Sequence, residues 1–388
     1  MESTPETTPL FSFDEPLDKL DDVLVSMLTV HSELGSADPA QERGETRGLD
    51  DDTWERLYAA ADRDGKQAEL LKLFDGLSVN KRVKALSTLA QAEAFLRAAH
   101  YGRRSGQDDN LVRKNLERAV QADSSVYSAW DALAEVMVAE RPRFLEMILA
   151  AATKRAEIKS PLFLRARHAL PEEGVPDPLR FKVLGPYVAE HPEDEAAFAD
   201  LDGALTRMGR FSDLAALREQ KLAAETDPAR RIPLIEALLD VYAERLRDAS
   251  KALGHAEALV ALDPNHPGAI ALLRRTSQQK PLAARAAEAL ALAANLRGDV
   301  GEEEQMYGVL LETVRGPKRK EILEKVYALK VNRGDGRGAR EALEGSLAIE
   351  PADDAVRALY KDAVRAEGIL ADGAKYLVKV STAAKEPD

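Results

Sequence analysis

The sequence predicts an all-α fold built from helical hairpins that stack on one another. Three residue pairs that end in proline, His191-Pro192, Asp227-Pro228 and Asp263-Pro264, stand at intervals of 36 residues. A period of this size is typical of a helix–turn–helix unit that cannot bury its apolar face without a neighbouring unit. Only 5% of the residues are aromatic, and alanine and leucine dominate the composition, which favours helices over strands.

The spacing of apolar and small residues within these intervals resembles that of the tetratricopeptide repeat (TPR) family. The matching positions in three units are Phe198, Leu201, Leu205, Ala216, Ala223 and Pro228; Leu234, Ala237, Leu238, Val241, Ala252, Ala256, Leu259 and Pro264; and Leu323, Val326, Ala339, Leu343 and Pro351. Asp202 and Gln220 depart from the pattern, and the second unit fits only if its inter-helix turn is two residues longer. The chain therefore resembles a divergent, bacterial-type TPR protein. The resemblance implies a right-handed α-α superhelix whose concave groove, lined mainly by the first helix of each hairpin, holds peptides or helices of other proteins.

The pattern divides the chain into seven regions. They are a disordered acidic tail (1–16), an amphipathic helix (17–34), a linker (35–49), divergent helical repeats (50–158), an irregular proline-rich bend (159–192), TPR-like repeats (193–381) and a tail (382–388). The bend contains Pro161, Pro171, Pro176, Pro178 and Pro186, which predict that only short helical pieces form there. After Pro264 the repeat phase slips once, because 266–279 forms a helix of its own.

The amphipathic helix has an apolar stripe of five residues, namely Leu17, Leu20, Leu24, Met27 and Leu28. Such a stripe needs a partner surface. It could cover the first repeat of this chain, or it could dock in a groove of another protein.

Several helix ends are predicted from local signals. Asp52 and Glu55 form a capping box, and residues 81–101 read as one long helix. Arg297-Gly298-Asp299 and Arg333-Gly334-Asp335 stand 36 residues apart. Glycine there would end one helix in a left-handed conformation and aspartate would cap the next, so we interpret both copies as turns and not as adhesion motifs.

Charge and composition narrow the function classes. Of the net charge of −13, residues 1–62 carry −12, from 16 acidic and 4 basic residues, which leaves about −1 for the rest. Because a nucleic-acid site needs a basic face, we expect no nucleic-acid partner. The chain has no cysteine, no secretory signal and no apolar run long enough to span a bilayer, which predicts a cytoplasmic protein without membrane insertion.

No motif assigns a catalytic, cofactor-binding or metal-binding residue. Six histidines are scattered without ligand spacing, namely His31, His100, His168, His191, His255 and His266. The acidic runs at Asp50–Asp52, Glu302–Glu304 and Asp353–Asp354 each begin a predicted helix, where negative charge is favoured. The alternating glycines 334, 336 and 338 lack the Gly-Lys-Ser/Thr of a phosphate-binding loop.

The sequence thus predicts a non-enzymatic scaffold or adaptor that binds other proteins and needs no cofactor. One alternative is a structural protein that self-associates through its terminal helices, since neither end has an obviously polar capping helix. A more remote alternative is an enzyme with a site near 159–192.

Overall fold

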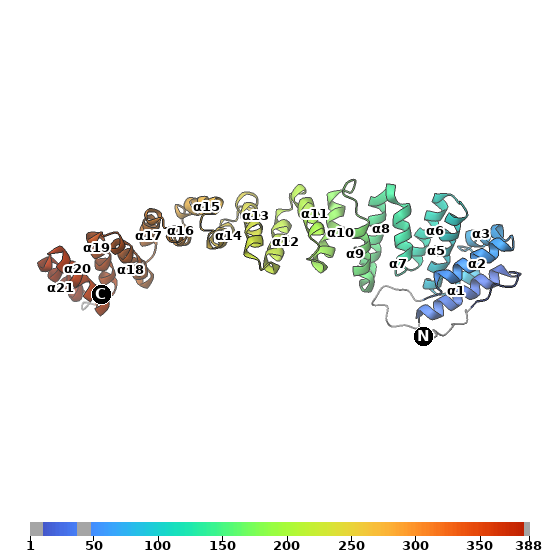
Figure 1. Ribbon diagram of the computed structural model, residues 1–388, viewed down its shortest axis with the longest axis horizontal. Helices are drawn as coiled ribbons and strands as arrows, with labels where there is room; N and C mark the ends of the chain where they lie inside the picture. The colour runs from blue at the N-terminus through green and yellow to red at the C-terminus, as the bar shows by residue number, and fades with distance from the viewer. Residues whose placement is uncertain (1–10, 37–47, 384–388) are drawn as a thin grey trace, which may run out of the picture. The chain divides into compact units, whose positions relative to one another are not determined.

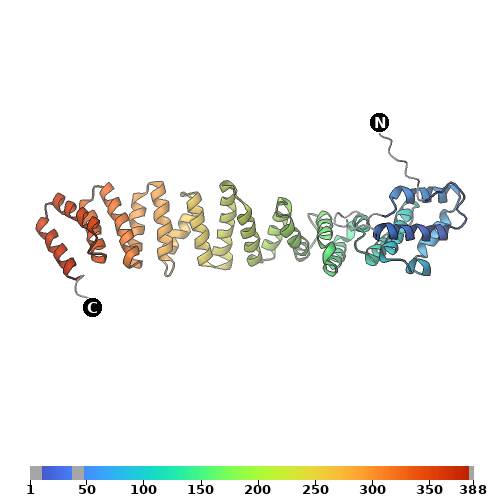
Figure 2. The ribbon, with the colours of Figure 1, turned by 90° about the horizontal axis from the view of Figure 1, so that it is seen from below.

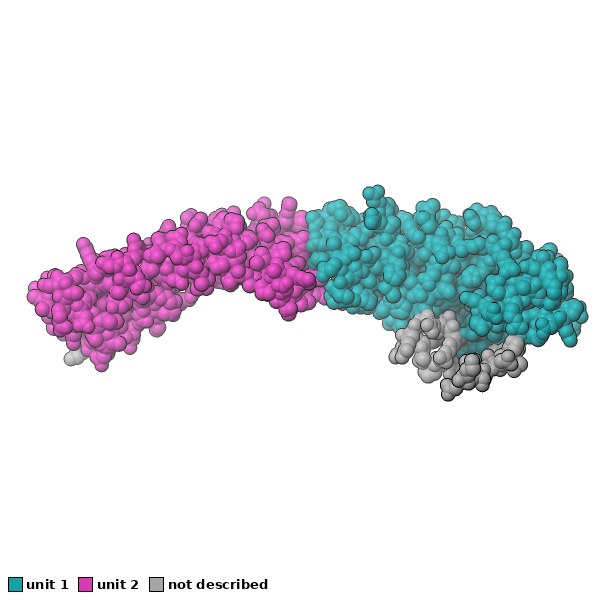
Figure 3. Space-filling model, viewed as in Figure 1, with its two compact units in different colours: residues 1–209 teal, residues 210–388 magenta. Residues whose placement is uncertain are grey.

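The computed structural model describes residues 11–36 and 48–383, and these residues form twenty-one α-helices and no strand. The chain divides into two compact units, residues 1–209 and 210–388, coloured separately in Figure 3. In unit 2 each helix packs against the next one in the chain, and in unit 1 most helices do so. The prediction of an all-α fold of stacked helical hairpins is confirmed.

Unit 1 contains eleven α-helices among its described residues. They are α1 (Leu20–Ser36), α2 (Asp51–Arg63), α3 (Gln67–Asp75), α4 (Lys81–Lys84), α5 (Thr88–Arg104), α6 (Asp109–Ala122), α7 (Tyr127–Val136), α8 (Arg141–Lys154), α9 (Lys159–His168), α10 (Asp177–Glu190) and α11 (Glu195–Arg207). Figure 1 labels each of them.

The described residues of unit 2 form ten α-helices, which lie side by side in chain order in Figure 1 and Figure 2. They are α12 (Phe211–Ala224), α13 (Pro228–Asp240), α14 (Ala249–Leu262), α15 (Pro267–Ser277), α16 (Ala283–Arg297), α17 (Val300–Thr313), α18 (Gly316–Asn332), α19 (Gly336–Ile349), α20 (Asp354–Glu367) and α21 (Leu370–Ala383). None of the described helices is long and apolar enough to cross a membrane.

The turns at the two Arg-Gly-Asp sequences have the predicted geometry. Gly298 and Gly334 both have a φ of 72°, which is a left-handed conformation that glycine adopts readily. Asp299 caps α17 by accepting a hydrogen bond from the backbone N–H of Glu302 at 3.1 Å. Asp335 accepts one from Gly338 at 2.9 Å at the start of α19. The 36-residue period therefore marks equivalent turns of two hairpins.

The two extra residues of the repeat that follows Pro228 do not lengthen the inter-helix turn, contrary to the prediction. Residues Val241–Leu246 continue α13 as a π-helical turn, and Arg247 ends it with a left-handed φ of 55°. A π turn holds additional residues within the helix. Leu238 and Val241 are buried, and so are Ile235, Leu239 and Tyr242.

Two of the three Pro-ended pairs do not begin a helix. Asp227 caps α13, with Pro228 in the first turn. After Asp263 the chain makes a turn, and His266 caps α15 through its Nδ1 atom, which accepts from Ala269 at 3.2 Å. There Pro267, and not Pro264, is the proline that occupies the first helical position.

Two predicted helix ends in unit 1 were also wrong, and so was the prediction of only short helical pieces in 159–192. The acceptor at the start of α2 is Asp50, which receives the Thr53 N–H at 2.8 Å, and not Asp52. Residues 81–101 form two helices, since Ser87 caps α5 separately. The region 159–192 contains the 14-residue helix α10, with Pro178 in its first turn and Pro186 inside it. It packs against α9 and α11, and the boundary between the compact units falls later, at 209.

Helix α1 packs within unit 1, against α3 and α5 (Figure 1). Its apolar stripe is buried, and Asp21 and Asp22 lie 2.8 and 2.7 Å from Arg82. Residues 11–16 of the predicted disordered tail also contact this unit, because Phe13 is buried and its carbonyl accepts from Arg63 at 2.9 Å. Residues 1–10, most of the predicted linker and 384–388 lie outside the described residues. This packing is that of a helix that covers its own unit.

A buried polar network joins α1 and α5 to the start of α2. The His31 Nδ1 atom accepts from the Leu49 N–H at 3.1 Å, and its Nε2 atom lies 3.7 Å from a Glu93 oxygen. The other Glu93 oxygen accepts from Arg97 at 2.5 Å, and Arg97 reaches Asp51 at 2.6 Å. Because His31, Glu93 and Arg97 are almost fully buried, the network holds α1 in one position.

We expect the free energy of unfolding to fall as the pH drops below about 6.5, the ordinary histidine pKa. Burial, with a smaller contribution from Arg97, lowers the pKa of His31 against the opposing effect of Glu93. The unfolded chain then binds a proton that the folded chain resists, so the stability is complete above the unfolded pKa and declines below it. Urea denaturation at neutral and mildly acidic pH should show a smaller decline for His31→Gln. Burial also lowers the pKa of His100 and His255, which are unchanged in the variant. If stability falls equally in the wild type and in His31→Gln, these other histidines account for the decline, and the role of His31 is contradicted.

Candidate functional site

In unit 2, α15 lies alone between the hairpins α13–α14 and α16–α17. It therefore changes which helices, the first or the second of each hairpin, lie on a given side of the unit. It contacts both of its neighbours, and α14 also contacts α16 directly. As a result α14, α16 and α18 face the same hollow, although α14 is the second helix of its own hairpin. The structure thus accounts for the predicted phase slip after Pro264.

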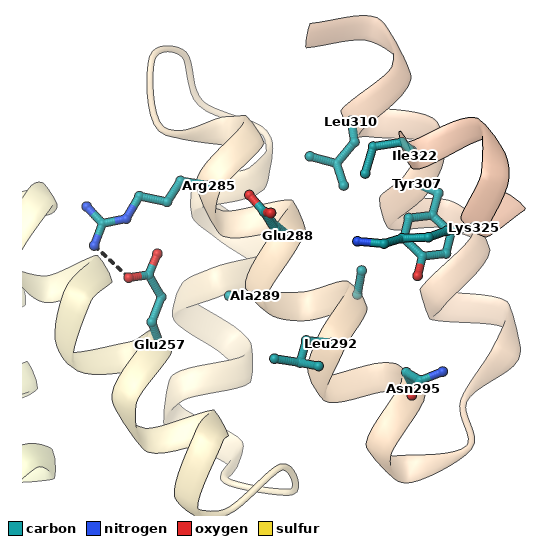
Figure 4. A pocket seen from close by; sticks show the side chains of 11 residues that line it. Glu257, Arg285, Glu288, Ala289, Leu292, Asn295, Tyr307, Leu310, Ile322 and Lys325 are labelled. Atoms are coloured by element: carbon teal, nitrogen blue, oxygen red, sulfur yellow. Dashed lines mark hydrogen bonds and ion pairs between the residues drawn. The ribbon is translucent and has the colours of Figure 1, made fainter. Parts of the chain in front are cut away.

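An open groove of about 510 Å³ lies between α14, α16, α17 and α18, and we call it the α14–α18 groove (Figure 4). Leu310 and Ile322 are fully buried at its bottom. Leu292 lines the same space and is 57% exposed, and Leu296, one helical turn further on, is 58% exposed. Exposed leucines beside a hollow are typical of a surface that a partner covers.

The sequence of α16 explains why its leucines are available. Its buried positions are mostly alanines, including Ala286, Ala287 and Ala294, which let α16 lie close to its neighbours. Leu292 and Leu296 are four residues apart and therefore share one face of the helix. Leu292 lines the groove on that face, and Leu296 lies one turn beyond the lining residues and is exposed.

Ion pairs between adjacent helices form the rim of the groove. Arg285 on α16 reaches Glu257 on α14 at 2.6 Å, which is the dashed contact in Figure 4. Lys318 on α18 reaches Glu288 on α16 at 2.9 Å. All four side chains are partly exposed, so each pair contributes little to stability. The pairs instead fix the positions of the charges around the apolar bottom.

One end of the groove is polar. Asn295 and Tyr307 both line it, and both donate hydrogen bonds to the Glu303 carboxylate, at 3.1 and 2.9 Å. Burial first, and then the hydrogen bond to Glu303, raise the pKa of Tyr307, so its hydroxyl stays protonated and acts as a donor. Figure 4 shows Tyr307 and Asn295 on the same side of the space between α16 and α18.

A second, more polar hollow of about 370 Å³ lies along α17, α18 and α19. Lys330 lines it and is paired with Glu304 at 2.5 Å and with Asp335 at 2.9 Å. Its charges neutralise one another, and its apolar side chains Leu311, Leu323 and Val326 are not strongly exposed. The α14–α18 groove is therefore the better candidate for binding.

The histidines and acidic runs considered in the sequence as possible chemical sites make structural contacts. His255 stacks on Tyr242, with ring centroids 5.4 Å apart, and the His191 ring is tilted against the Tyr187 ring, with centroids 4.6 Å apart. Asp50, Asp299 and Asp353 each accept a hydrogen bond at a helix start. Within residues 11–36 and 48–383, no group of three or more His, Asp or Glu side chains is placed to hold a metal ion.

Sequence reasoning missed the groove residues and Glu303. The repeat pattern determines the residue types at buried positions only, so it does not identify the exposed residues that line a groove. A usable signal was nevertheless present, since Leu292 and Leu296 fall outside the alanine-lined buried stripe of α16. Glu303 looked like one more helix-start carboxylate within an acidic run.

No protein-family model matches the chain, and comparison with curated proteins finds no match. Among solved structures, the chain is similar to BtubC (BKLC) from P. vanneervenii, with 18% identity over 63% of this chain and 94% of that one, at a TM-score of 0.24. It is also similar to the C-terminal part of a TPR repeat-containing protein from Cytophaga hutchinsonii, with 15% identity over 78% and 97% at a TM-score of 0.21. A third is the structure of Naa15/Naa10 bound to HypK-THB, with 14% identity over 92% and 68% at 0.22. Values this low say nothing about binding or activity, and the fold rests on the packing described above.

Proposed function

We propose that this protein is a non-enzymatic, TPR-like scaffold or adaptor that binds a segment of another protein in the α14–α18 groove. The observation that carries the proposal is the exposed Leu292 in an apolar hollow that is also lined by the buried Leu310 and Ile322. Leu296, which is exposed as well, lies one helical turn further along α16. Covering leucines of this kind removes apolar surface from water, which favours association.

The form of the groove supports a protein segment as its occupant. Its length runs over several helices, and its rim consists of charges that are already paired, such as Arg285 with Glu257. An amphipathic helix or extended segment can lay apolar side chains into such a groove while its polar side faces the rim. The net charge of −13 disfavours nucleic acid as the partner. Location in the cytoplasm remains a prediction from composition.

We expect Leu292→Glu to abolish binding of short peptides selected from a random library by the full-length protein. The glutamate would place a charge in the apolar part of the groove, where desolvation is unfavourable. Fluorescence polarisation of the selected peptides checks this result, and thermal melting checks that the variant stays folded. Val138→Glu is a matched control, because Val138 is 61% exposed and belongs to unit 1, whereas the groove is formed by helices of unit 2. Peptides that bind the Leu292→Glu variant as well as the wild type would contradict the proposal.

The alternative function, self-association, is favoured by the exposed face of α21. Leu370 is 59% exposed and Val378 is 65% exposed, and their spacing of eight residues places them on one side of the helix. Sedimentation at several concentrations distinguishes this function, since assembly through α21 should be lost in a Leu370→Glu, Val378→Glu double variant.

The remote enzymatic alternative would use residues near 159–192, but both hollows described above lie in unit 2. The buried Arg180 of that region instead holds the Pro171 and Glu172 carbonyls at 2.8 Å.

A further inference from the structure

In the acidic run Glu302–Glu304 at the start of α17, two of the three carboxylates have a basic partner. Glu302 pairs with Arg274 at 2.5 Å, and Glu304 pairs with Lys330 at 2.5 Å. Glu303, between them, is the most deeply buried of the three at 5% exposure. Within the described part of the chain, no Arg, Lys or His side chain forms an ion pair with it.

Neutral donors alone satisfy Glu303. One of its oxygens accepts from the Asn295 amide and from the Tyr307 hydroxyl, and both of these side chains line the α14–α18 groove. Neutral hydrogen bonds compensate only part of the desolvation of a carboxylate. A cation that approached from the groove would meet a negative charge in a region of low dielectric, where the attraction is stronger than in water.

The cations already present at the groove are engaged elsewhere. Arg285 pairs with Glu257, and Lys325 pairs with Glu321 at 2.9 Å. Glu303 therefore has no cationic partner among the described residues, and its carboxylate is bonded to Asn295 and Tyr307, which line the groove.

We infer that the segment bound in the α14–α18 groove places a basic side chain, lysine or arginine, at the Asn295–Tyr307 end, against Glu303. An apolar side chain of the same segment covers Leu292. This inference rests on the proposed function, and it names the class of partner: a basic and apolar protein segment, as opposed to an acidic one or a free carboxyl terminus. Electrostatic complementarity at a desolvated position selects the partner, while the leucines supply apolar contact area.

The test compares the selected peptides with analogues in which one basic residue is neutral and nearly isosteric, norleucine for lysine or citrulline for arginine. With the full-length wild type, the analogue should bind about tenfold more weakly, which is the low end of coupling measured for close charge pairs across interfaces. With Glu303→Gln, which keeps an oxygen for Asn295 and Tyr307, peptide and analogue should bind within about twofold of each other. Glu304→Gln removes the same charge one residue along the chain and should retain the tenfold difference.

Each result separates the inference from the proposed function. Peptides that are lost with Leu292→Glu but bind equally well without their basic residue overturn the inference and leave the groove as a binding site. Selection of acidic peptides, or an analogue penalty that persists in Glu303→Gln, also overturns it. A second copy of this chain as the occupant, seen as concentration-dependent sedimentation that Leu292→Glu abolishes, overturns it too. Failure to select any peptide that Leu292→Glu affects counts against the proposed function itself.

Discussion

Replacing Arg97 with alanine is expected to lower the free energy of unfolding of unit 1 by about 3–5 kcal/mol, the usual effect of removing one partner of a buried ion pair. Arg97 is 7% exposed and Glu93 is 3% exposed, so the variant leaves a carboxylate inside the protein without its cation. The guanidinium also lies over the Trp54 ring, 5.3 Å from its centroid, and this contact would be lost as well.

The matched control removes both charges. In the double variant Glu93→Gln, Arg97→Met no uncompensated charge remains, so the loss should be smaller than for Arg97→Ala alone. Urea denaturation gives the free energies, and amide hydrogen exchange of α1 and α5 shows where the protein loosens. Alanine and double variants of equal stability would show that the network contributes through packing alone.

This network also shows what the sequence could not predict. Glu93 and Arg97 are four residues apart on a helix, a spacing that usually marks a solvent-exposed ion pair. They are buried because α1 and the start of α2 cover that face of α5, and these contacts join residues far apart in the chain. His31 has no metal-ligand spacing in the sequence, yet it connects α1 to the same network.

The fold itself could be predicted because its determinants are local and repeated. Turn residues such as Gly298 and Asp299 fix where helices end, and the apolar spacing fixes which face is buried. The π turn at Val241–Leu246 could not be predicted, because an inserted residue can lengthen either a turn or a helix. The groove could not be located either, since it depends on α15 bringing α14 into line with α16 and α18.

Replacing Trp130 with alanine is expected to destabilise unit 1 by about 3–5 kcal/mol, the usual range for a large aromatic residue removed from a core. Trp130 on α7 is 2% exposed and meets the Phe144 ring on α8 edge to face, with centroids 6.1 Å apart. Its indole N–H also donates to the Ser124 carbonyl at 3.0 Å, which fixes the turn before α7. Alanine leaves a cavity between the two helices and removes this bond.

The two tryptophans of the chain allow the cavity and the hydrogen bond to be separated. Trp130→Phe keeps an aromatic ring but loses the bond to Ser124, whereas the buried Trp54 indole N–H has no hydrogen-bond partner among the described residues. Trp54→Phe should therefore be less destabilising than Trp130→Phe, because it also removes an unsatisfied donor from the core. Thermal and urea denaturation of the three variants should give the order Trp130→Ala, Trp130→Phe, Trp54→Phe from most to least destabilised. The reverse order for the two phenylalanine variants would mean that the Arg97 contact with the Trp54 ring outweighs the hydrogen bond of Trp130.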